Sequence, residues 1–164
     1  MKSQMIQHQF NQVPVQKKQR SIFNRDRSVK MAFDHGKLTP FLVDEIIPGD
    51  SFNVDLSVFT RLATPLFPIM DNIKLDVYGF FCPSRILWDN FEKFQGSRDN
   101  PGDSIDYTIP VVDVKTHQTE SLSDYFGIPV APTSRTNAQE VNALPYRMYN
   151  KIYNDWIVTG KQQG

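Results

Sequence analysis

A chain of 164 residues has room for one domain, and its 18 basic and 18 acidic residues leave no net charge. Its one cysteine, Cys82, excludes an internal disulfide framework and favours a reducing compartment such as a bacterial cytoplasm. Because no apolar run approaches the roughly 18–20 residues that span a bilayer and the amino terminus lacks an apolar signal core, we expect neither membrane insertion nor secretion.

The first 31 residues form a basic segment. They hold seven basic residues against one acidic residue, a net of +6, and the remaining chain holds 11 basic and 17 acidic residues. Their few apolar residues show no sustained period, so this segment buries too little apolar surface to offset its ordering entropy. We therefore expect an extended arm over residues 1–31 that becomes ordered on a partner, followed by a domain over residues 32–164.

Two segments have the alternating pattern of strands. After a turn at Pro48-Gly49-Asp50, apolar and polar residues alternate over residues 52–58, which predicts a strand with one buried face. Asp71-Asn72 marks the next turn, and residues 73–82 alternate again but end with aromatic side chains on both faces. An aromatic outer face indicates that another layer or another subunit covers it.

Three helical segments and one weak strand follow. Pro83 ends the second strand, Ser84 is a candidate N-cap, and helical spacing continues to Gly96. Residues 105–114 suggest a short strand broken by a proline, and residues 121–127 read as a short helix with serine caps and a glycine exit. The last helix begins near residue 142 with Pro145 in its first turn, and Gly160 ends it.

The sequence offers no enzymatic centre, so we predict no catalytic residue, metal site or cofactor. The histidines, His8, His35 and His117, lack a second ligand at metal-binding spacing, and we interpret them as surface or turn residues. The acidic residues around the turn at 48–50 lack the spaced oxygens of a calcium loop. Cys82 has no histidine near it in sequence and is interpreted as a small buried hydrophobic residue.

The basic arm is the feature with a plausible ligand. Its cations can neutralise phosphates and release counterions, which gives salt-sensitive binding without sequence preference. The alternatives are a solvated tail and an arm that lies over a neighbouring subunit. The candidate nucleic-acid contacts are Lys17, Lys18, Arg20, Arg25, Arg27 and Lys30.

Aromatic residues in the second strand and in the first and last helical segments are candidate subunit contacts. A stripe at helical spacing in the last helix could stack nucleic-acid bases, but such a stripe is more often core or interface. The candidate interface residues are Tyr78, Phe80, Trp88, Phe91, Tyr149, Tyr153 and Trp156.

Five collinear segments resemble the amino-terminal part of the major capsid protein of microviruses, small phages of the gokushovirus type. Among them, residues 61–72 read RLATPLFPIMDN, and residues 80–96 read FFCPSRILWDNFEKFQG. The segments are residues 33–52, 61–72, 80–96, 121–129 and 144–156. Together they cover most of residues 20–157 in the family's order.

This resemblance implies a mainly β coat protein with inserted helices, whose jelly-roll barrel is incomplete in this chain. In the family, identical copies build an icosahedral shell around single-stranded DNA, sometimes with other virion proteins. The implied location is the virion, after assembly in the bacterial host cytoplasm. Because family members are several times longer, we expect the sheet to be completed by other chains or by the remainder of a longer protein.

Two other functions remain open at this point. The first is a non-enzymatic module that binds single-stranded nucleic acid through the basic arm. The second is a sugar-binding or hydrolytic β-sandwich, which shares the jelly-roll architecture but needs a site that the sequence does not offer.

Overall fold

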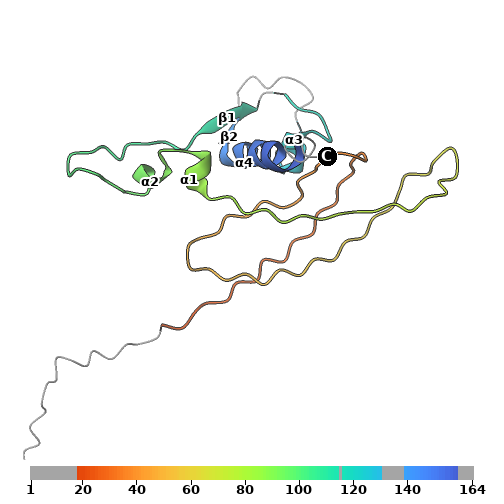
Figure 1. Ribbon diagram of the computed structural model, residues 1–164, viewed down its shortest axis with the longest axis horizontal. Coiled ribbons are helices and arrows are strands. Elements are labelled where there is room, and N and C mark those ends of the chain that lie inside the picture. The colour runs from red at the N-terminus through yellow and green to blue at the C-terminus, as the bar shows by residue number, and fades with distance from the viewer. Residues whose placement is uncertain (1–17, 115, 131–138, 159–164) are drawn as a thin grey trace, which may run out of the picture. The chain divides into compact units, whose positions relative to one another are not determined.

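The computed structural model describes residues 18–114, 116–130 and 139–158, and the chain divides into two units, residues 1–30 and 31–164. Residues 18–30 of the first unit are extended and exposed. In the second unit, the described residues form short helices and one small sheet (Figure 1). In chain order these elements are α1 (Ser84–Leu87), α2 (Phe91–Phe94), β1 (Val111–Val114), α3 (Leu122–Tyr125), β2 (Gln139–Asn142), α4 (Leu144–Ile152) and η1 (Tyr153–Val158). The predicted boundary between residues 31 and 32 stays a prediction.

The sheet is an antiparallel pair of β1 and β2, with Val112 opposite Val141. Its pairing continues one step further, because the backbone N–H of Ala143 donates to the carbonyl of Pro110 at 2.9 Å. Proline can accept but cannot donate, so the strand predicted over residues 105–114 is formed only after Pro110. The sequence pattern did not predict β2, because a segment of four residues is too short to show a clear period.

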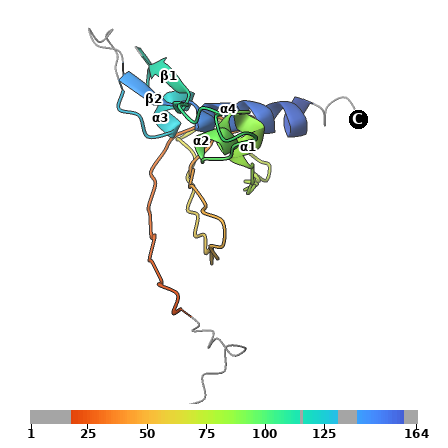
Figure 2. The same ribbon diagram turned by 90° about the vertical axis from the view of Figure 1, so that its left-hand side faces the viewer.

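The small core lies where β1, β2, α3 and α4 meet, and Figures 1 and 2 both show these elements gathered together. Val114 and Ala143 are its buried apolar side chains among the described residues. Phe126 packs edge-on against Tyr146, with ring centroids 4.9 Å apart. The predicted short helix is confirmed as α3, whose N-cap Ser121 accepts a hydrogen bond from the backbone N–H of Asp124.

One helix predicted between residues 84 and 96 is in fact two separate turns. α1 ends where Trp88 adopts an extended backbone, and the N–H of Phe91 then bonds to the carbonyl of Trp88 at 3.0 Å. The intervening Asp89 and Asn90 favour turns over helix interiors, which explains the break. Pro83 takes the N-cap position that we assigned to Ser84, and Ser84 is the first helical residue instead.

The predicted last helix is confirmed as α4, with Pro145 in its first turn. It continues into a π-helical segment, η1, which the sequence pattern did not predict. A π-helix bonds residue i to i+5, so Trp156 leaves the stripe that ideal helical spacing assigns to it. The predicted stop at Gly160 lies outside the described residues.

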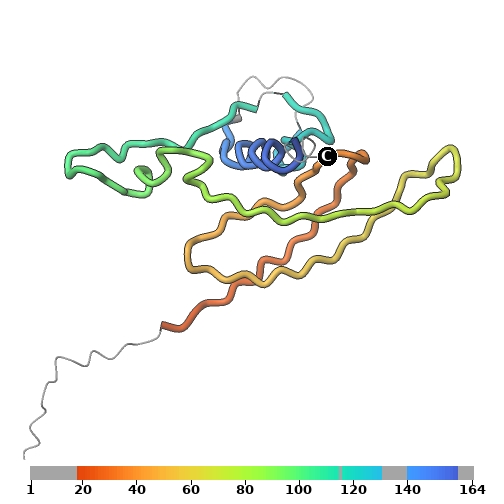
Figure 3. The backbone as a smooth tube through the Cα atoms, viewed as in Figure 1, coloured from red at the N-terminus to blue at the C-terminus, as the bar shows by residue number. Residues whose placement is uncertain are grey.

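The two predicted strands over residues 52–58 and 73–82 are not formed as strands among the described residues and run as extended backbone. Between residues 18 and 110, all of them described, the chain forms no strand ladder. Figure 3 traces this part of the second unit as open runs, coloured from orange to green. Turns nevertheless fall where they were expected, since the N–H of Asp50 donates to the carbonyl of Ile47 at 3.1 Å. A strand is defined by its ladder with a neighbouring strand, and among the described residues the ladder joins β1 and β2 and includes neither segment.

Two interpretations of single residues are corrected. His117 is not a surface residue but is buried, and its Nε2 lies 3.1 Å from the carbonyl oxygen of Ile128. Cys82 is half-buried rather than buried. Both corrections concern burial, which depends on how separate segments pack and cannot be read from the pattern of neighbouring residues.

Candidate functional site

Three predicted interface residues meet at the end of the second extended segment. The ring of Phe80 lies 5.8 Å from that of Trp156 and 6.3 Å from that of Tyr78, measured between centroids. The extended segment supplies Tyr78 and Phe80, and η1 supplies Trp156. The indole remains 67% exposed despite this contact. The structure therefore joins these three aromatic residues, with Phe80 half-buried and Tyr78 and Trp156 largely exposed.

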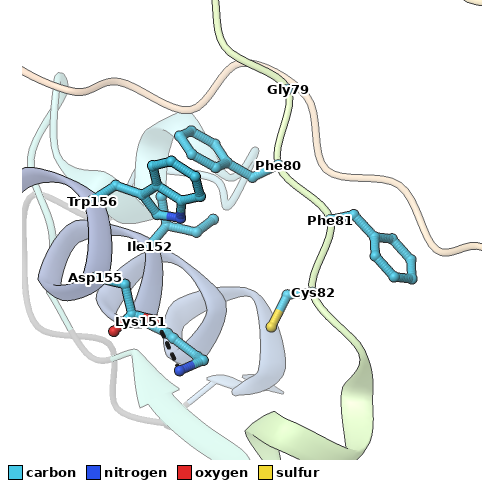
Figure 4. Close-up of a pocket in the computed structure, with 8 residues that line it drawn as sticks. All are labelled: Gly79, Phe80, Phe81, Cys82, Lys151, Ile152, Asp155 and Trp156. Carbon is cyan, nitrogen blue, oxygen red and sulfur yellow. Dashed lines mark ion pairs between the residues drawn. The ribbon is translucent and has the colours of Figure 1, made fainter.

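A pocket of about 160 Å³ lies beside this aromatic group (Figure 4). Residues 79–82 of the extended segment line one side, and α4 and η1 line the other. Figure 4 shows the Phe80 ring turned toward Trp156, whereas Phe81 points away from the helix. The residues that line the pocket are Gly79, Phe80, Phe81, Cys82, Lys151, Ile152, Asp155 and Trp156.

Two opposite charges compensate each other in the pocket wall. Lys151 Nζ lies 2.9 Å from Asp155 Oδ2, the i, i+4 spacing that helices favour. The hydrogen bond to Asp155, together with the charge of that carboxylate, holds the pKa of Lys151 above its ordinary value. The pocket thus presents aromatic and aliphatic surface and an internally balanced ion pair.

Sequence reasoning missed several of these lining residues. Lys151 and Asp155 were recognisable as an i, i+4 pair, but nothing in the sequence placed them opposite Cys82. Ile152 belonged to the amphipathic stripe and was taken as a packing residue. The missing information was which extended segment crosses the helix.

Trp88 and Phe91 form a separate local cluster. The Trp88 ring lies 6.4 Å from Phe91 and 5.4 Å from Phe94, so its neighbours come from α2. Both residues are half-buried. Arg147 Nη1 donates to the carbonyl of Leu87 at 3.0 Å, which ties α1 to α4. These two candidates are thus apart from the Phe80–Trp156 group in their contacts, and their role as interface residues stays a prediction.

Tyr149 and Tyr153 stack on each other at 6.3 Å, but Tyr149 also has an internal role. Its hydroxyl donates to the carbonyl of Leu38 at 2.9 Å, and burial, with a smaller effect of Tyr153, raises its pKa. Similarly, the Tyr125 hydroxyl donates to the carbonyl of Ala32 at 2.9 Å. These two hydroxyl groups attach residues 32–38, which precede the first predicted strand, to α3 and α4.

The described part of the basic arm is exposed throughout. Its one carboxylate, Asp26, accepts a hydrogen bond from the Asn24 side chain at 2.9 Å, and Asn24 Oδ1 accepts from the Asp26 backbone N–H at 3.2 Å. Lys17 lies outside the described residues. The arm's other candidate contacts, all within the described range, are Lys18, Arg20, Arg25, Arg27 and Lys30. Their contact with nucleic acid stays a prediction.

A long apolar surface accompanies the two extended segments. Large hydrophobic side chains that a strand would bury on one face are exposed here, Val54 to 81%. At the apex between the segments, residues 62–70 expose Leu66 to 97%, Phe67 to 81% and Met70 to 96%. Exposed apolar surface of this extent is typical of a protein that is covered by something else.

The described part of the chain holds neither a metal-binding cluster nor a membrane-spanning helix. Among those residues, no group of three or more His, Cys, Asp or Glu side chains is placed to hold a metal ion. None of the helices they form is both long enough and apolar enough to cross a membrane.

Comparison with known proteins gives a consistent result. Residues 11–162 match the family described as Capsid protein (F protein). The chain is 49% identical over 153 residues to capsid protein VP1 of Bdellovibrio phage phiMH2K, covering 92% of this chain and 28% of that protein. It is 38% identical over 160 residues to capsid protein VP1 of Chlamydia phage 1, covering 93% of this chain and 26% of that protein. With VP1 of Spiroplasma virus 4 the identity is 33% over 130 residues, or 77% of this chain and 23% of that protein.

Proposed function

The chain belongs to the phage capsid protein (F protein) family, and we propose on this basis that it is a structural part of a virion shell. It spans about a quarter of the length of the VP1 relatives that it matches, from 23% to 28%. The proposal therefore concerns part of a subunit, and the resemblance of its five segments makes the amino-terminal part the one proposed; 92% of the chain aligns with the relative from phage phiMH2K. Its role is non-catalytic, and its place is the virion, after assembly in the bacterial host cytoplasm.

The observation that carries this proposal is the family match over residues 11–162. The exposed apolar surface of the two extended segments supports it. In a shell, the rest of the subunit and the neighbouring copies bury the apolar surfaces of such strands and loops. The jelly-roll barrel and the icosahedral arrangement of copies are the finer parts of the proposal, as is the division into an arm over residues 1–31 and a barrel part over residues 32–164.

The proposed partners are identical copies of the subunit and a single-stranded DNA genome, with other virion proteins as further neighbours. Among the candidate interface residues, Tyr78, Phe80 and Trp156 have the best support because they form one aromatic group in which Tyr78 and Trp156 are exposed. The cations of the arm are the proposed contacts to DNA. The chain's acidic remainder, with a net charge of −6, makes the arm the natural place for phosphate contacts.

The decisive experiment measures self-association of the purified chain. Sedimentation velocity over a range of concentrations, with electron microscopy of the same samples, is expected to show large assemblies rather than a compact monomer. Val54→Lys, which places a charge on the apolar side of the first extended segment, is expected to shift the distribution toward smaller species. Ser57→Lys is the matched control, since it adds the same charge on the polar side.

Two outcomes argue against the proposal. A compact monomer at every concentration contradicts assembly by this part of the chain. Equal effects of Val54→Lys and Ser57→Lys contradict the role assigned to the apolar side. That result would mean that the added charge, and not its position, weakens self-association.

A further inference from the structure

The pocket beside Trp156 and the apex of the extended segments, residues 62–70, have complementary chemistry. We propose that the apex loop of one copy inserts Phe67 into the Phe80–Trp156 pocket of a second copy. This inference rests on the proposed function, because it assumes that copies of the chain meet. It adds to that function a specific head-to-tail contact between two different surfaces.

The size of the pocket suits one aromatic side chain. Its volume of about 160 Å³ compares with the roughly 150 Å³ apolar cavity that accommodates a benzene ring. The Phe80 ring lines the side formed by the extended segment and the Trp156 ring the side formed by η1, and aromatic rings attract a further ring in edge-on or offset geometry. Ile152 adds aliphatic surface on the side of α4.

The charge of the pocket favours a neutral guest over a phosphate. Lys151 is its one cationic lining residue, and Asp155 neutralises it at 2.9 Å. A nucleotide needs cationic groups in excess of the carboxylates near its phosphate. A neutral apolar side chain needs no such group, so the pocket suits a protein loop better than the DNA backbone.

The apex loop is built to present its side chains outward. Pro65 and Pro68 flank Leu66-Phe67 and restrict the backbone, which lowers the entropy lost when the loop docks. Phe67 is 81% exposed, and the charged residues nearest to it in sequence are Arg61 and Asp71. The loop is thus an exposed, preorganised apolar projection.

The same chain does not fill its own pocket. Residues 68–78 separate Phe67 from the pocket, and extended backbone rises about 3.3 Å per residue, so the path from the apex spans roughly 35–40 Å. Figures 1 and 3 show the apex, in yellow-green, at the far end of the extended run from α4. An apex loop that enters this pocket therefore comes from a second copy. A contact between two different surfaces also repeats from copy to copy, as a ring or a closed shell requires.

The first test uses a synthetic peptide with the sequence of residues 61–71, titrated into the full chain. Trp156 reports binding in a Trp88→Phe background, where it is the one remaining tryptophan. We expect a blue shift of its emission as the indole loses contact with water. A peptide carrying Phe67→Ala is expected to bind at least tenfold more weakly, because a buried aromatic anchor dominates contacts of this kind. Alkylation of Cys82, which lines the pocket, is expected to abolish the shift without any change of sequence.

The second test uses the chain's single cysteine as a cross-linking partner. Phe67→Cys under mild oxidation is expected to give a ladder of disulfide-linked species, with the introduced thiol joined to Cys82 of the next copy by mass spectrometry. Phe59→Cys is the matched control, because Phe59 is 93% exposed but lies outside the apex. That control is expected to give no such link to Cys82 above the background of random collisions.

The outcomes separate this contact from assembly in general. If the chain assembles but the peptide leaves Trp156 unchanged and the Phe67→Cys link is absent, the contact is wrong and the proposed function stands. If the peptide binds with the stated Phe67 dependence but the chain stays monomeric, the contact stands and assembly by this chain is contradicted. Equal binding of the Phe67→Ala peptide overturns the contact directly.

Discussion

Two of the short helices, α2 and α3, are each followed by a glycine with a positive φ angle. Gly96 follows α2 with φ of 99°, and Gly127 follows α3 with φ of 81°. These values lie in the left-handed region, which glycine enters without strain and a residue with a Cβ does not. Because no atom lies within 4 Å of a Cβ built at either glycine, the preference for glycine comes from the backbone alone.

Gly127→Ala is expected to destabilise the chain by about 1–2 kcal/mol, the cost of a left-handed angle for an L residue. Gly102→Ala is the matched control, since its φ is not positive and a Cβ there also meets nothing within 4 Å. The control is expected to be neutral or slightly stabilising, because alanine restricts the unfolded chain. Urea denaturation followed by circular dichroism measures both, and equal effects would show that the angle at Gly127 is not what ends α3.

At the scale of elements, two tyrosines connect residues 32–38 to the helices α3 and α4. Tyr125 of α3 and Tyr149 of α4 each donate a hydroxyl hydrogen bond to a backbone carbonyl, at Ala32 and Leu38. Among the described residues, residues 32–38 belong to no strand ladder. The two tyrosine hydroxyl groups therefore supply hydrogen bonds to backbone carbonyls that a neighbouring strand supplies in a sheet.

Removal of one such bond is expected to loosen residues 32–38 selectively. Tyr149→Phe keeps the ring that packs near Phe126 but loses the hydroxyl, at a cost of about 1 kcal/mol. Cleavage after Lys37 by trypsin, quantified by mass spectrometry, is expected to accelerate, while cleavage after Lys93 in α2 serves as the internal control. A uniform acceleration at both sites would instead indicate general destabilisation.

The same hydroxyl predicts a pH dependence. Burial raises the pKa of Tyr149 in the folded chain above its ordinary value of 10.0. The folded state therefore favours the protonated hydroxyl, whose contribution is complete below pH 10 and is lost as the pH rises through the folded-state pKa. Stability measured from neutral pH to above pH 10 is expected to fall more steeply in the native chain than in Tyr149→Phe. Parallel curves would contradict this assignment.

At the scale of the whole molecule, the charge is divided between a basic first part and an acidic remainder. The first 31 residues carry +6 and the rest carry −6. Such a distribution suits a protein that has an anionic partner on one side and keeps its other surfaces free of phosphate. It also makes binding by the arm separable, by its salt dependence, from the apolar contacts between copies.

Binding of a single-stranded oligothymidylate is expected to weaken steeply with salt. Six arm cations, Lys17 to Lys30, correspond to a slope of log K against log salt of roughly −4. Arg25→Gln with Arg27→Gln is expected to make this slope less steep by about 1.4, because two phosphate contacts are lost. Lys93→Gln with Arg98→Gln removes the same charge outside the arm and is expected to leave the slope unchanged. An equal effect of the two pairs would place the DNA contacts elsewhere.

Much of the local structure was predictable, because it depends on residues that are close in sequence. The cap at Ser121, the exit at Gly127 and the start of α4 with Pro145 all follow from short-range hydrogen bonding and allowed backbone angles. The aromatic nature of the candidate interface was predictable for the same reason, since alternation and helical spacing select Tyr78, Phe80 and Trp156. The break at Trp88 was missed because helical spacing says nothing about the turn preference of Asp89 and Asn90 within it.

The sequence by itself determined the family, the basic composition of the first 31 residues, the apolar strand patterns and the positions of most turns. Only the tertiary structure decided that Phe80 meets Trp156, that His117 is buried and that residues 139–142 pair with β1. The physical reason is range: caps and periods are set by neighbours a few residues away, whereas a pocket or a ladder joins segments that the chain must bring together. The strands over residues 52–58 and 73–82 show the same limit, because a pattern can predict a strand face but cannot supply the neighbour that pairs with it.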